Sequence, residues 1–386
     1  MGSRTLVVTN DFPPRPGGIQ SFVHGLLLQQ DPDSIVVYAS NWHASEVFDQ
    51  TAAFEVIRDS AQVLLPDPRT ARRVSAVFRS TGCDRVLFGA AAPLGLLAPR
   101  LRSAGAVRAV GLTHGHEAAW AQLPGSRVTL RRIGRGLDTV TYLGEYTRSR
   151  IAAALDPSAA AAMRRLVPGV DGDRFSPAVD GSQVRNRYGL GERPVIVCVS
   201  RLMARKGQDT LIAALPDIRR RVPDAVLLVV GGGPYRANLV RQAVALDVDK
   251  HVIFAGAVAW QELPEHYAAG DVFAMPCRTR RGGLDVEGLG IVYLEASASG
   301  LAVVAGNSGG APDAVRDGIT GHIVAGSPDQ PQETGDRLVD LLLDPDRAKA
   351  MGRSGRDWVL SDWGWQRSGI RLAAMLDGAD PDYIAG

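Results

Sequence analysis

The stretch VIVCVSRLMARKGQDTLIAALPDIRRR, residues 195–221, contains one complete strand–loop–helix unit. It opens with Val195–Val199, a continuous apolar run rich in β-branched residues, which is typical of a strand buried on both faces. Gln208–Arg221 then has the length and pattern of a helix. We therefore predict one βα unit of a parallel sheet, joined by a polar loop.

The same alternation occurs along most of the chain. The other predicted strands are Thr5–Thr9, Ile35–Ala39, Val86–Phe88, Ala109–Leu112, Thr139–Leu143, Val226–Val230, Val252–Ala255, Val272–Met275 and Ala302–Ala305. The other predicted helices are Ile19–Gln30, Tyr235–Leu246, Ile291–Ser299 and Gln332–Leu343. The Gly- and Pro-rich segment 166–177, LVPGVDGDRFSP, interrupts the pattern. We therefore predict an α/β protein with two Rossmann-like, doubly wound domains that face a cleft.

Composition narrows the class of protein. The chain has 386 residues, of which 45% are hydrophobic and 22% charged, so it can form two cores and is neither disordered nor collagen-like. Its 43 basic and 41 acidic residues nearly balance, which argues against bulk binding of nucleic acid. The cysteines Cys83, Cys198 and Cys277 lie far apart, so we expect no disulfide framework or zinc site, and a reducing cytosol fits.

No membrane span or secretory signal is expected. The apolar run near the N-terminus is too short for a signal peptide, and no stretch reaches the roughly 18 apolar residues of a spanning helix. Any contact with a membrane would therefore be peripheral and from the cytosolic side.

Two loops of the first half follow strands, where ligands bind in open α/β sheets. Gly17 and Gly18 lie between the first strand and its helix, where they could form a simple turn or let a phosphate or sugar approach. The absence of a GxGxxG pattern there weakens the case for a dinucleotide enzyme. His114 and His116 follow the strand Ala109–Leu112 and are candidates for function. These histidines and Glu117 could suggest a metal site. We do not expect one, because residues at i and i+2 of a strand-like segment share one face without a third ligand there.

Charged residues follow the strands of the second half. Arg201 and Lys206 share one loop and could clamp a diphosphate. Only three of the 43 basic residues are lysines, which makes a lysine there informative. Glu287 precedes a helix, and Gly288, Leu289 and Gly290 would offer backbone N–H groups to phosphate. Glu295 lies on a mostly apolar helix and needs either a donor, such as a pair of sugar hydroxyls, or an internal salt bridge.

These motifs, in this order, resemble the retaining GT-B glycosyltransferases of the family 4 type, which include sucrose synthases and bacterial phosphatidylinositol mannosyltransferases. The resemblance rests on Gly17-Gly18, THGHE, VPGVDGDRFSP, SRLMARKG, VVGGGPY, FAGAV, the glutamate–seven–glutamate pair and GNSGGAPDAV. It covers nearly the whole chain. Two features depart from the family: Asp313 replaces a usual glutamate, and the loop Arg278–Asp285 is longer and more basic than typical.

The resemblance implies a domain plan. Residues 1–168 would form the acceptor domain, 169–181 the hinge and 182–361 the nucleotide-sugar domain. Residues 362–378 would form a helix that crosses back to the N-terminal domain. It also implies hexosyl transfer with retention, without a cofactor or metal.

The resemblance further implies roles for single residues. Arg201 and Lys206 would neutralise the donor diphosphate, and Glu295 would bind the ribose hydroxyls. Glu287 and the backbone of Gly288, Leu289, Gly290 and Ile291 would face the donor sugar and phosphates. Val258 would meet the base, Gly17 and Gly18 would approach the phosphate or the acceptor, and His114 would contact the sugar, with His116 as its rival.

Within the family, the chain looks most like enzymes that move mannose from GDP-mannose to a monomannosylated phosphoinositide lipid. Such an acceptor would place the protein at the inner face of the plasma membrane. The segment 126–136 offers four arginines to an anionic surface, namely Arg127, Arg131, Arg132 and Arg135, with Val128, Leu130 and Ile133 as apolar surface. An ordinary solvated helix face is the alternative interpretation of this segment. The segment Arg69–Arg79 is a second candidate.

Two other functions remain open at this point. A soluble-acceptor glycosyltransferase or a sugar-nucleotide 2-epimerase would use the same fold, although we find no additional acid/base carboxylates for an epimerase. A non-catalytic binder of nucleotide sugars is the third possibility, and the intact histidine, Arg–Lys and glutamate motifs argue against it.

Overall fold

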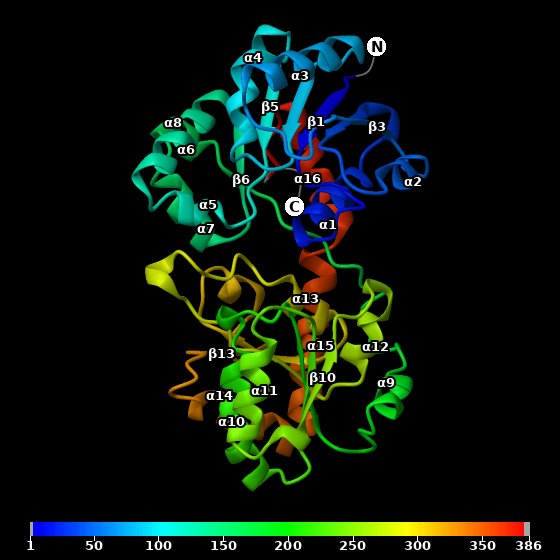
Figure 1. Cartoon of the computed structure of the whole chain (residues 1–386), viewed down its shortest axis with the longest axis vertical. Coiled ribbons are helices and arrows are strands. Elements are labelled where there is room, and N and C mark those ends of the chain that lie inside the picture. The colour runs from blue at the N-terminus through cyan, green and yellow to red at the C-terminus, as the bar shows by residue number, and fades with distance from the viewer. Residues whose placement is uncertain (1–2, 382–386) are drawn as a thin grey trace. The chain divides into compact units, whose positions relative to one another are not determined.

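Both halves of the chain fold into parallel sheets with the same strand order, as the computed structural model shows (Figure 1). The structure describes residues 3–381. Unit 1 consists of residues up to Gly169 and from Trp365 onward, and unit 2 runs from Val170 to Gly364. The predicted pair of Rossmann-like α/β domains is confirmed, whereas the cleft between them stays a prediction.

Unit 1 contains a seven-stranded sheet. Its strands are β1 Thr5–Thr9, β2 Ile35–Ala39, β3 Glu55–Arg58, β4 Arg85–Phe88, β5 Arg108–Gly111, β6 Thr139–Tyr142 and β7 Arg164–Arg165. Its helices are α1 Gly18–Leu27, α2 Ser45–Asp49, α3 Pro68–Ser80, α4 Ala98–Ser103, α5 Glu117–Trp120, α6 Pro124–Gly136, α7 Glu145–Ala152, α8 Pro157–Ala161 and α16 Trp365–Asp377. The order β3-β2-β1-β4-β5-β6-β7 is that of a doubly wound sheet.

Unit 2 contains a six-stranded sheet in the order β10-β9-β8-β11-β12-β13. Its strands are β8 Val195–Val199, β9 Val226–Val230, β10 Val252–Gly256, β11 Val272–Met275, β12 Ala302–Gly306 and β13 Gly321–Val324. Its helices are α9 Ser182–Arg187, α10 Gln208–Arg221, α11 Arg236–Ala245, α12 Leu263–Ala268, α13 Ile291–Ala298, α14 Gln332–Leu343 and α15 Pro345–Asp362. Helices α10, α11 and α14 pack together on one face, and α13 packs with α15 on the other.

Side chains of β1 explain how both faces of the unit 1 sheet are buried. Leu6 and Val8 belong to a cluster that includes Phe78 of α3 and Ile133 of α6. The opposite face is covered by α1 and by α16, which lies beside α1 in Figure 1. Phe22 of α1 meets Trp365 of α16, with their ring centroids 6.4 Å apart. The C-terminal helix is therefore part of the unit 1 core.

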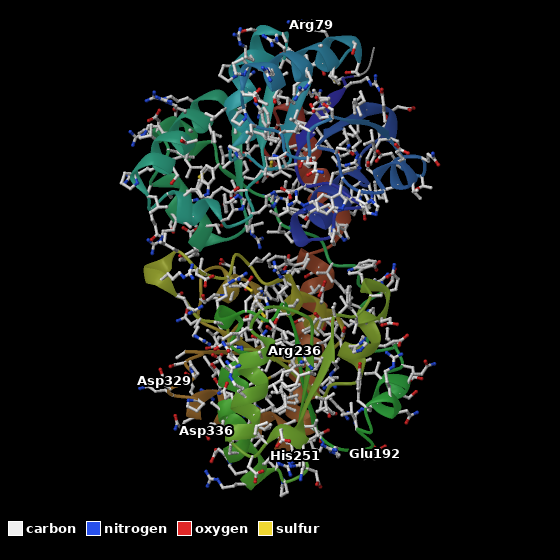
Figure 2. All side chains as sticks on the ribbon, in the orientation of Figure 1. Arg79, Glu192, Arg236, His251, Asp329 and Asp336 are labelled. Carbon is white, nitrogen blue, oxygen red and sulfur yellow. The ribbon has the colours of Figure 1, made fainter. Side chains whose placement is uncertain are left out.

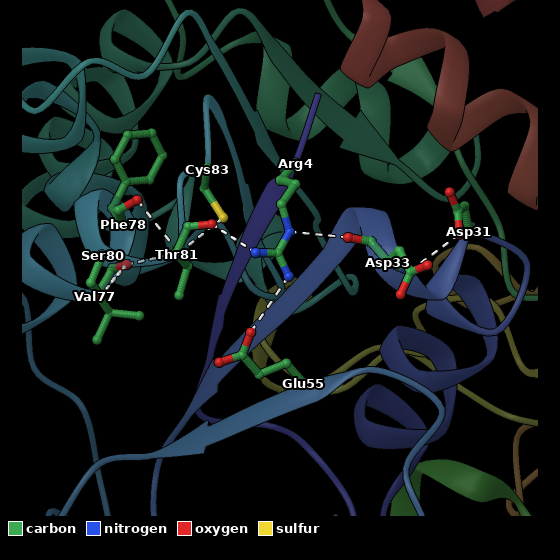
Figure 3. A network of polar contacts seen from close by, with 9 residues as sticks. All are labelled: Arg4, Asp31, Asp33, Glu55, Val77, Phe78, Ser80, Thr81 and Cys83. Carbon is green, nitrogen blue, oxygen red and sulfur yellow. Dashed lines mark hydrogen bonds and ion pairs between the residues drawn. The ribbon is translucent and has the colours of Figure 1, made fainter. Parts of the chain in front are cut away.

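One arginine ties together the amino ends of the unit 1 strands (Figure 3). Arg4 donates hydrogen bonds to the backbone oxygens of Thr81 at 2.7 Å and Asp33 at 3.0 Å, and it approaches the Glu55 carboxylate at 3.5 Å. Its backbone N–H donates to Asp84. These contacts lie at the sheet edge opposite the loops in which ligands bind, so they stabilise the fold and leave the carboxyl edge free for function.

Three strands and one helix boundary differ from the sequence prediction. β3, β7 and β13 were not predicted, because none of them forms a continuous apolar run. The final helix begins at Trp365, whereas Trp363 caps α15 and is buried in unit 2. Within residues 3–381, no helix is both long and apolar enough to cross a bilayer.

Candidate active site

In unit 2 the chain reverses its winding between β8 and β11, the point where ligands bind in doubly wound sheets. The loops that follow these two strands contain most of the residues predicted to hold the donor. Lys206 comes from the first loop and Glu287 from the second, and the Lys206 Nζ lies 2.6 Å from the Glu287 Oε2. Both side chains are largely buried, with 12% and 8% of their surface exposed. The structure therefore joins these two residues in one ion pair.

The second member of the predicted clamp is placed differently. The Arg201 side chain is exposed and has no ion pair in the described part of the chain. Its backbone oxygen accepts a hydrogen bond of 3.1 Å from Gln208, the first residue of α10. Arg201 is thus held at its backbone while its guanidinium stays available for an anion.

The glycines of GNSGGAPDAV support the loop that contains Glu287. Gly309 has a φ of +57°, and a Cβ there would lie 2.0 Å from the backbone oxygen of Glu287. The N–H of Gly310 donates to that same oxygen at 2.9 Å. Only a residue without a side chain allows this approach, so the motif positions the Glu287 loop.

Glu295 lies on α13, one turn beyond the glycines that begin this helix. Its carboxylate accepts a hydrogen bond of 2.8 Å from the Tyr267 hydroxyl, and burial raises its pKa to about 7. That hydrogen bond and the nearby Arg174 partly oppose the shift. The expected alternative of an internal salt bridge is therefore wrong, because the direct partner of Glu295 is a neutral hydroxyl. A neutral partner leaves the carboxylate able to accept further hydrogen bonds.

Val258 and the residues around α13 complete the unit 2 part of the candidate site. Val258 is half-buried in the loop after β10. Gly290 caps α13 with a φ of 79°, and Leu289 and Gly290 are buried while Gly288 and Ile291 are partly accessible. The first amide groups of α13 are thus at the same sheet edge as Lys206.

In unit 1 the first loop is held by a short polar network. Gly17 adopts a φ of 155°, and a Cβ there would lie 2.3 Å from the Gln20 Oε1. Gln20 donates a 2.8 Å hydrogen bond to Asp11, which lies two residues beyond the end of β1. Gly18 has open space around it. Glycine is therefore required at position 17 by geometry, and position 18 is the one left accessible.

His114 is oriented by the backbone of a neighbouring loop. Its Nε2 lies 2.6 Å from the carbonyl oxygen of Gly89, and since a carbonyl only accepts, Nε2 must hold the proton. Burial lowers the pKa of the ring, so it is neutral, and Nδ1 is a hydrogen-bond acceptor. Phe22 packs edge-on against the ring at 5.6 Å. The arrangement suits acceptance of a hydrogen bond from a hydroxyl group at Nδ1.

His116 has another environment. It is exposed, and its Nε2 lies 3.3 Å from the fully buried carboxylate of Glu117. The other oxygen of Glu117 accepts a 2.9 Å bond from the backbone N–H of His114. The Glu117 carboxylate thus stabilises the conformation of the loop that contains both histidines. Among residues 3–381, no group of three or more His, Cys, Asp or Glu side chains is placed to hold a metal ion.

The comparison with known proteins supports one family. Residues 182–358 match the family described as Glycosyl transferases group 1. Over 97% of its length the chain is 53% identical to 98% of the GDP-mannose-dependent alpha-(1-6)-phosphatidylinositol monomannoside mannosyltransferase of Mycolicibacterium smegmatis. The chain belongs to the group 1 glycosyltransferases.

A second relative of this glycosyltransferase comes from Corynebacterium glutamicum. It is named GDP-mannose-dependent monoacylated alpha-(1-6)-phosphatidylinositol monomannoside mannosyltransferase and is 48% identical over 97% of both chains. Among solved structures, HepE of Anabaena in complex with UDP matches with a TM-score of 0.81 at 19% identity, over 97% of this chain and 100% of that one. WaaG, a glycosyltransferase involved in lipopolysaccharide biosynthesis, matches with a TM-score of 0.68 at 19% identity, over 97% and 100%. These two likenesses confirm the GT-B fold.

The arginines of α6 in this glycosyltransferase are less available than predicted. Arg131 and Arg135 both pair with Asp156, at 3.5 and 2.5 Å, and Arg127 donates to the backbone oxygen of Ala153. Arg132 is exposed. Leu130 and Ile133 were expected to add apolar surface, and this is wrong because both lie in the core of unit 1. Of the predicted apolar residues, Val128 is the exposed one, at 50%.

Several residues that shape the site were not found from the sequence. Tyr267 donates a hydrogen bond to Glu295, and the carbonyl of Gly89 accepts one from His114. Neither a tyrosine within a helix nor a backbone carbonyl has a local sequence pattern that indicates such a role. Asp209 in the first turn of α10 binds Arg278 through two hydrogen bonds. Its position fits an ordinary interaction with the helix dipole, so its pairing could not be read from the sequence.

Proposed function

We propose that this glycosyltransferase moves mannose from GDP-mannose to phosphatidylinositol monomannoside, with retention of configuration, to give the dimannoside. The observation that supports this most is the full-length identity of 48–53% to relatives named for that reaction. The residues that the family resemblance assigns to the donor are all present, and Lys206 and Glu287 are in contact.

The geometry suggests how the chain would act on the donor. Lys206 and Arg201 would neutralise the diphosphate as it departs, in place of a metal ion. Lys206 would exchange part of its contact with Glu287 for a phosphate oxygen, so Glu287 keeps the ammonium in place before the donor binds. Glu295 would accept hydrogen bonds from the ribose hydroxyls, and the backbone at Val258 would meet the base.

The sugar would be oriented by neutral groups. His114 would accept a hydrogen bond from a mannose hydroxyl at Nδ1, since Nε2 is engaged by Gly89. In the transfer, the bond between the anomeric carbon and the diphosphate oxygen breaks, and a bond to the acceptor hydroxyl forms on the same face. The proton of that hydroxyl goes to the departing diphosphate. Positioning and charge stabilisation then supply the rate enhancement.

A donor and acceptor screen with the purified protein tests this function. We expect transfer of mannose from GDP-mannose to phosphatidylinositol monomannoside, and no comparable rate with UDP-glucose. Absence of both donor hydrolysis and transfer would refute the proposal. Transfer to a soluble acceptor alone, or epimerisation of the donor, would support the alternative functions instead.

We further propose that the protein binds the inner face of the plasma membrane peripherally through unit 1. Besides α6, the start of α3 offers a suitable surface. Val63 and Leu65 are each 56% exposed, and Arg69 and Arg72 are exposed with no ion pair in the described chain. Arg79 lies at the other end of this helix (Figure 2). Apolar and cationic side chains together favour an anionic bilayer surface.

Co-sedimentation with vesicles containing phosphatidylinositol tests the two surfaces separately. The variant Arg69→Glu/Arg72→Glu reports on α3, and Arg131→Glu/Arg132→Glu reports on α6. We expect wild-type binding that needs anionic lipid and that falls at least fivefold in one of the two variants. Equal binding by wild type and both variants would refute docking through either surface.

A further inference from the structure

The loop that departs from the family pattern forms a hairpin beside Lys206. It leaves the carboxyl end of β11, and Arg280 and Asp285 pair as an antiparallel bridge at its base. Its tip consists of Arg281, Gly282 and Gly283, which all have positive φ, at 52°, 61° and 95°. The hairpin is therefore an ordered projection from the same sheet edge as the proposed donor site.

Buried contacts anchor this hairpin to the donor loop. Arg278 donates two hydrogen bonds, of 2.7 and 2.6 Å, to the carboxylate of Asp209 at the start of α10. Tyr235 donates to the same carboxylate at 3.0 Å. The backbone N–H of Arg278 donates to the carbonyl of Arg205 at 2.8 Å. Since Arg205 immediately precedes Lys206, the hairpin and the predicted phosphate-binding lysine are held as one piece.

The two loops after β8 and β11 carry more positive charge than the donor needs. Between Ser200 and Glu287, their cations are Arg201, Arg205, Lys206, Arg278, Arg280 and Arg281, and their carboxylates are Asp209, Asp285 and Glu287. Lys206 pairs with Glu287, and Arg278 with Asp209. Asp285 is shared by Arg205 at 3.8 Å and Arg280 at 3.7 Å. Three positive charges remain without a matching carboxylate.

A sugar nucleotide accounts for only part of this excess. Its diphosphate bears one negative charge on each phosphate, so it would match two of the three surplus cations. Arg201 and Lys206 lie in the first loop, whereas the hairpin arginines lie in the second. One positive charge then remains, and it would match the single negative charge of a phosphodiester.

The backbone conformation of Arg281 also indicates that its side chain binds a ligand. A bulky residue at a φ of 52° is strained relative to glycine or asparagine, by an amount on the order of 1 kcal/mol. Two glycines follow it, so a glycine would serve the turn equally well. The side chain is exposed and has no ion pair in the described residues. An arginine kept in such a conformation is expected to bind something.

We propose that the hairpin Arg278–Asp285 binds the phosphodiester of the lipid acceptor, with Arg281 and Arg280 as the recognising groups. Arg278 serves as the anchor through Asp209. This inference rests on the proposed function, because it takes a phosphoinositide as the acceptor. Arginine is suited to the task since its planar guanidinium binds phosphate oxygens in pairs.

The test uses Arg281→Asn and Arg280→Gln in the full chain. Asparagine tolerates positive φ, so the first variant removes the charge with little change in the turn. Arg220→Gln is the matched control, since it removes an exposed arginine from the last turn of α10. Unfolding temperatures equal to wild type would establish that the variants are folded.

We expect each hairpin variant to raise the KM for phosphatidylinositol monomannoside about tenfold, as loss of a charged hydrogen bond does. The KM for GDP-mannose and the rate with a phosphate-free alkyl mannoside should stay within about twofold. A rise in the KM for GDP-mannose alone would assign the hairpin to the donor. No change in either KM would make its arginines ordinary surface charges. Both results would overturn the proposal.

Binding of glycerophosphoinositol, a water-soluble phosphodiester, separates this inference from the function itself. By calorimetry we expect wild type to bind it and Arg281→Asn to bind at least fivefold more weakly. If the protein transferred no mannose to the lipid yet showed this difference, the proposed function would fail and the phosphodiester site would stand. Equal binding by the variant would overturn the site whatever the outcome for transfer.

Discussion

The carboxyl edges of the two sheets differ in how they hold polar side chains. In unit 1, His114 and Glu117 are fixed by hydrogen bonds to backbone groups, and His114 is kept neutral by burial. In unit 2, the loops after β8 and β11 take part in two largely buried ion pairs, Lys206 with Glu287 and Arg278 with Asp209 of α10. The loop after β5 thus presents the neutral ring of His114, whereas the loops after β8 and β11 present charged groups.

This difference matches two kinds of ligand chemistry. Neutral acceptors such as the His114 Nδ1 suit hydroxyl groups, whereas clustered cations suit phosphates. Two sheets with the same strand order therefore differ in the chemistry of their loops. Substitutions at the two edges should accordingly change different kinetic parameters.

The largest effect is expected at Lys206. Lys206→Ala removes the cation of the first loop and leaves the Glu287 carboxylate buried without its partner. Turnover should fall by about 100-fold or more, as loss of one electrostatic group in an active site commonly does. Steady-state kinetics with GDP-mannose measure the change.

Lys250→Ala is the matched control for this substitution. Lys250 is one of the other two lysines and is exposed in the turn before β10. It should retain the wild-type rate. Near wild-type turnover in Lys206→Ala would refute the diphosphate role. It would also show that charge at the carboxyl edge of the unit 2 sheet does not control turnover.

The two histidines of unit 1 test the neutral edge. His114→Ala removes the oriented acceptor and should lower turnover about 10- to 30-fold, in line with loss of one or two hydrogen bonds. His116→Ala should change turnover by less than about threefold, since that ring is exposed and its contacts are the Glu117 carboxylate and the stacked ring of His114. Measurement of both variants with the same donor decides which histidine contacts the sugar, and a larger loss in His116→Ala would reverse the assignment.

Most of the fold could be predicted because buried parallel strands leave a strong pattern. Strands such as Val195–Val199 and Val272–Met275 are apolar on both faces, and their predicted bounds agree with the structure. β3 could not be predicted, since Glu55–Arg58 is an edge strand with partly exposed residues and has no such run. The hydrophobic pattern of a sequence reflects burial, so it does not reveal strands at the edge of a sheet, whose residues are partly exposed.

The candidate site was predictable in its residues but not in its pairings. Position after a strand singled out Lys206, Glu287 and His114 as candidates for function. Nothing in the sequence indicated that Glu287 would neutralise Lys206, or that Tyr267 would donate to Glu295. Such contacts join segments that are distant in the chain, and they depend on the packing of loops whose conformation has no periodic signal.

Glu295→Gln should separate binding from stability. Burial raises the pKa of Glu295 to about 7, so the stability contributed by its neutral form is complete below the ordinary value of 4.5 and is lost as pH rises through 7. The glutamine variant should therefore unfold at a higher temperature than wild type at pH 8 and at a similar temperature at pH 5. The upper bound on its advantage is on the order of 3 kcal/mol.

The same variant should bind GDP about tenfold more weakly at pH 8, because the charged acceptor for the ribose hydroxyls is gone. Thermal unfolding and calorimetry at both pH values measure the two effects. Glu192→Gln, at an exposed position on unit 2 (Figure 2), is the control and should change neither. Unchanged GDP affinity in Glu295→Gln would contradict the ribose assignment.

The smallest effect on turnover is expected at Arg4, on the amino edge of unit 1 (Figure 3). Arg4→Met removes the hydrogen bonds to Thr81 and Asp33 and should lower the free energy of unfolding by about 1–2 kcal/mol, since the side chain is one-third exposed. Turnover should stay within about twofold of wild type, because these contacts lie away from the loops that follow the strands. Urea unfolding and turnover at 25 °C measure the two quantities. A tenfold loss of turnover in a variant that unfolds like wild type would show that the amino edge also shapes the site. Residues that control turnover would then not be confined to the carboxyl edges of the two sheets.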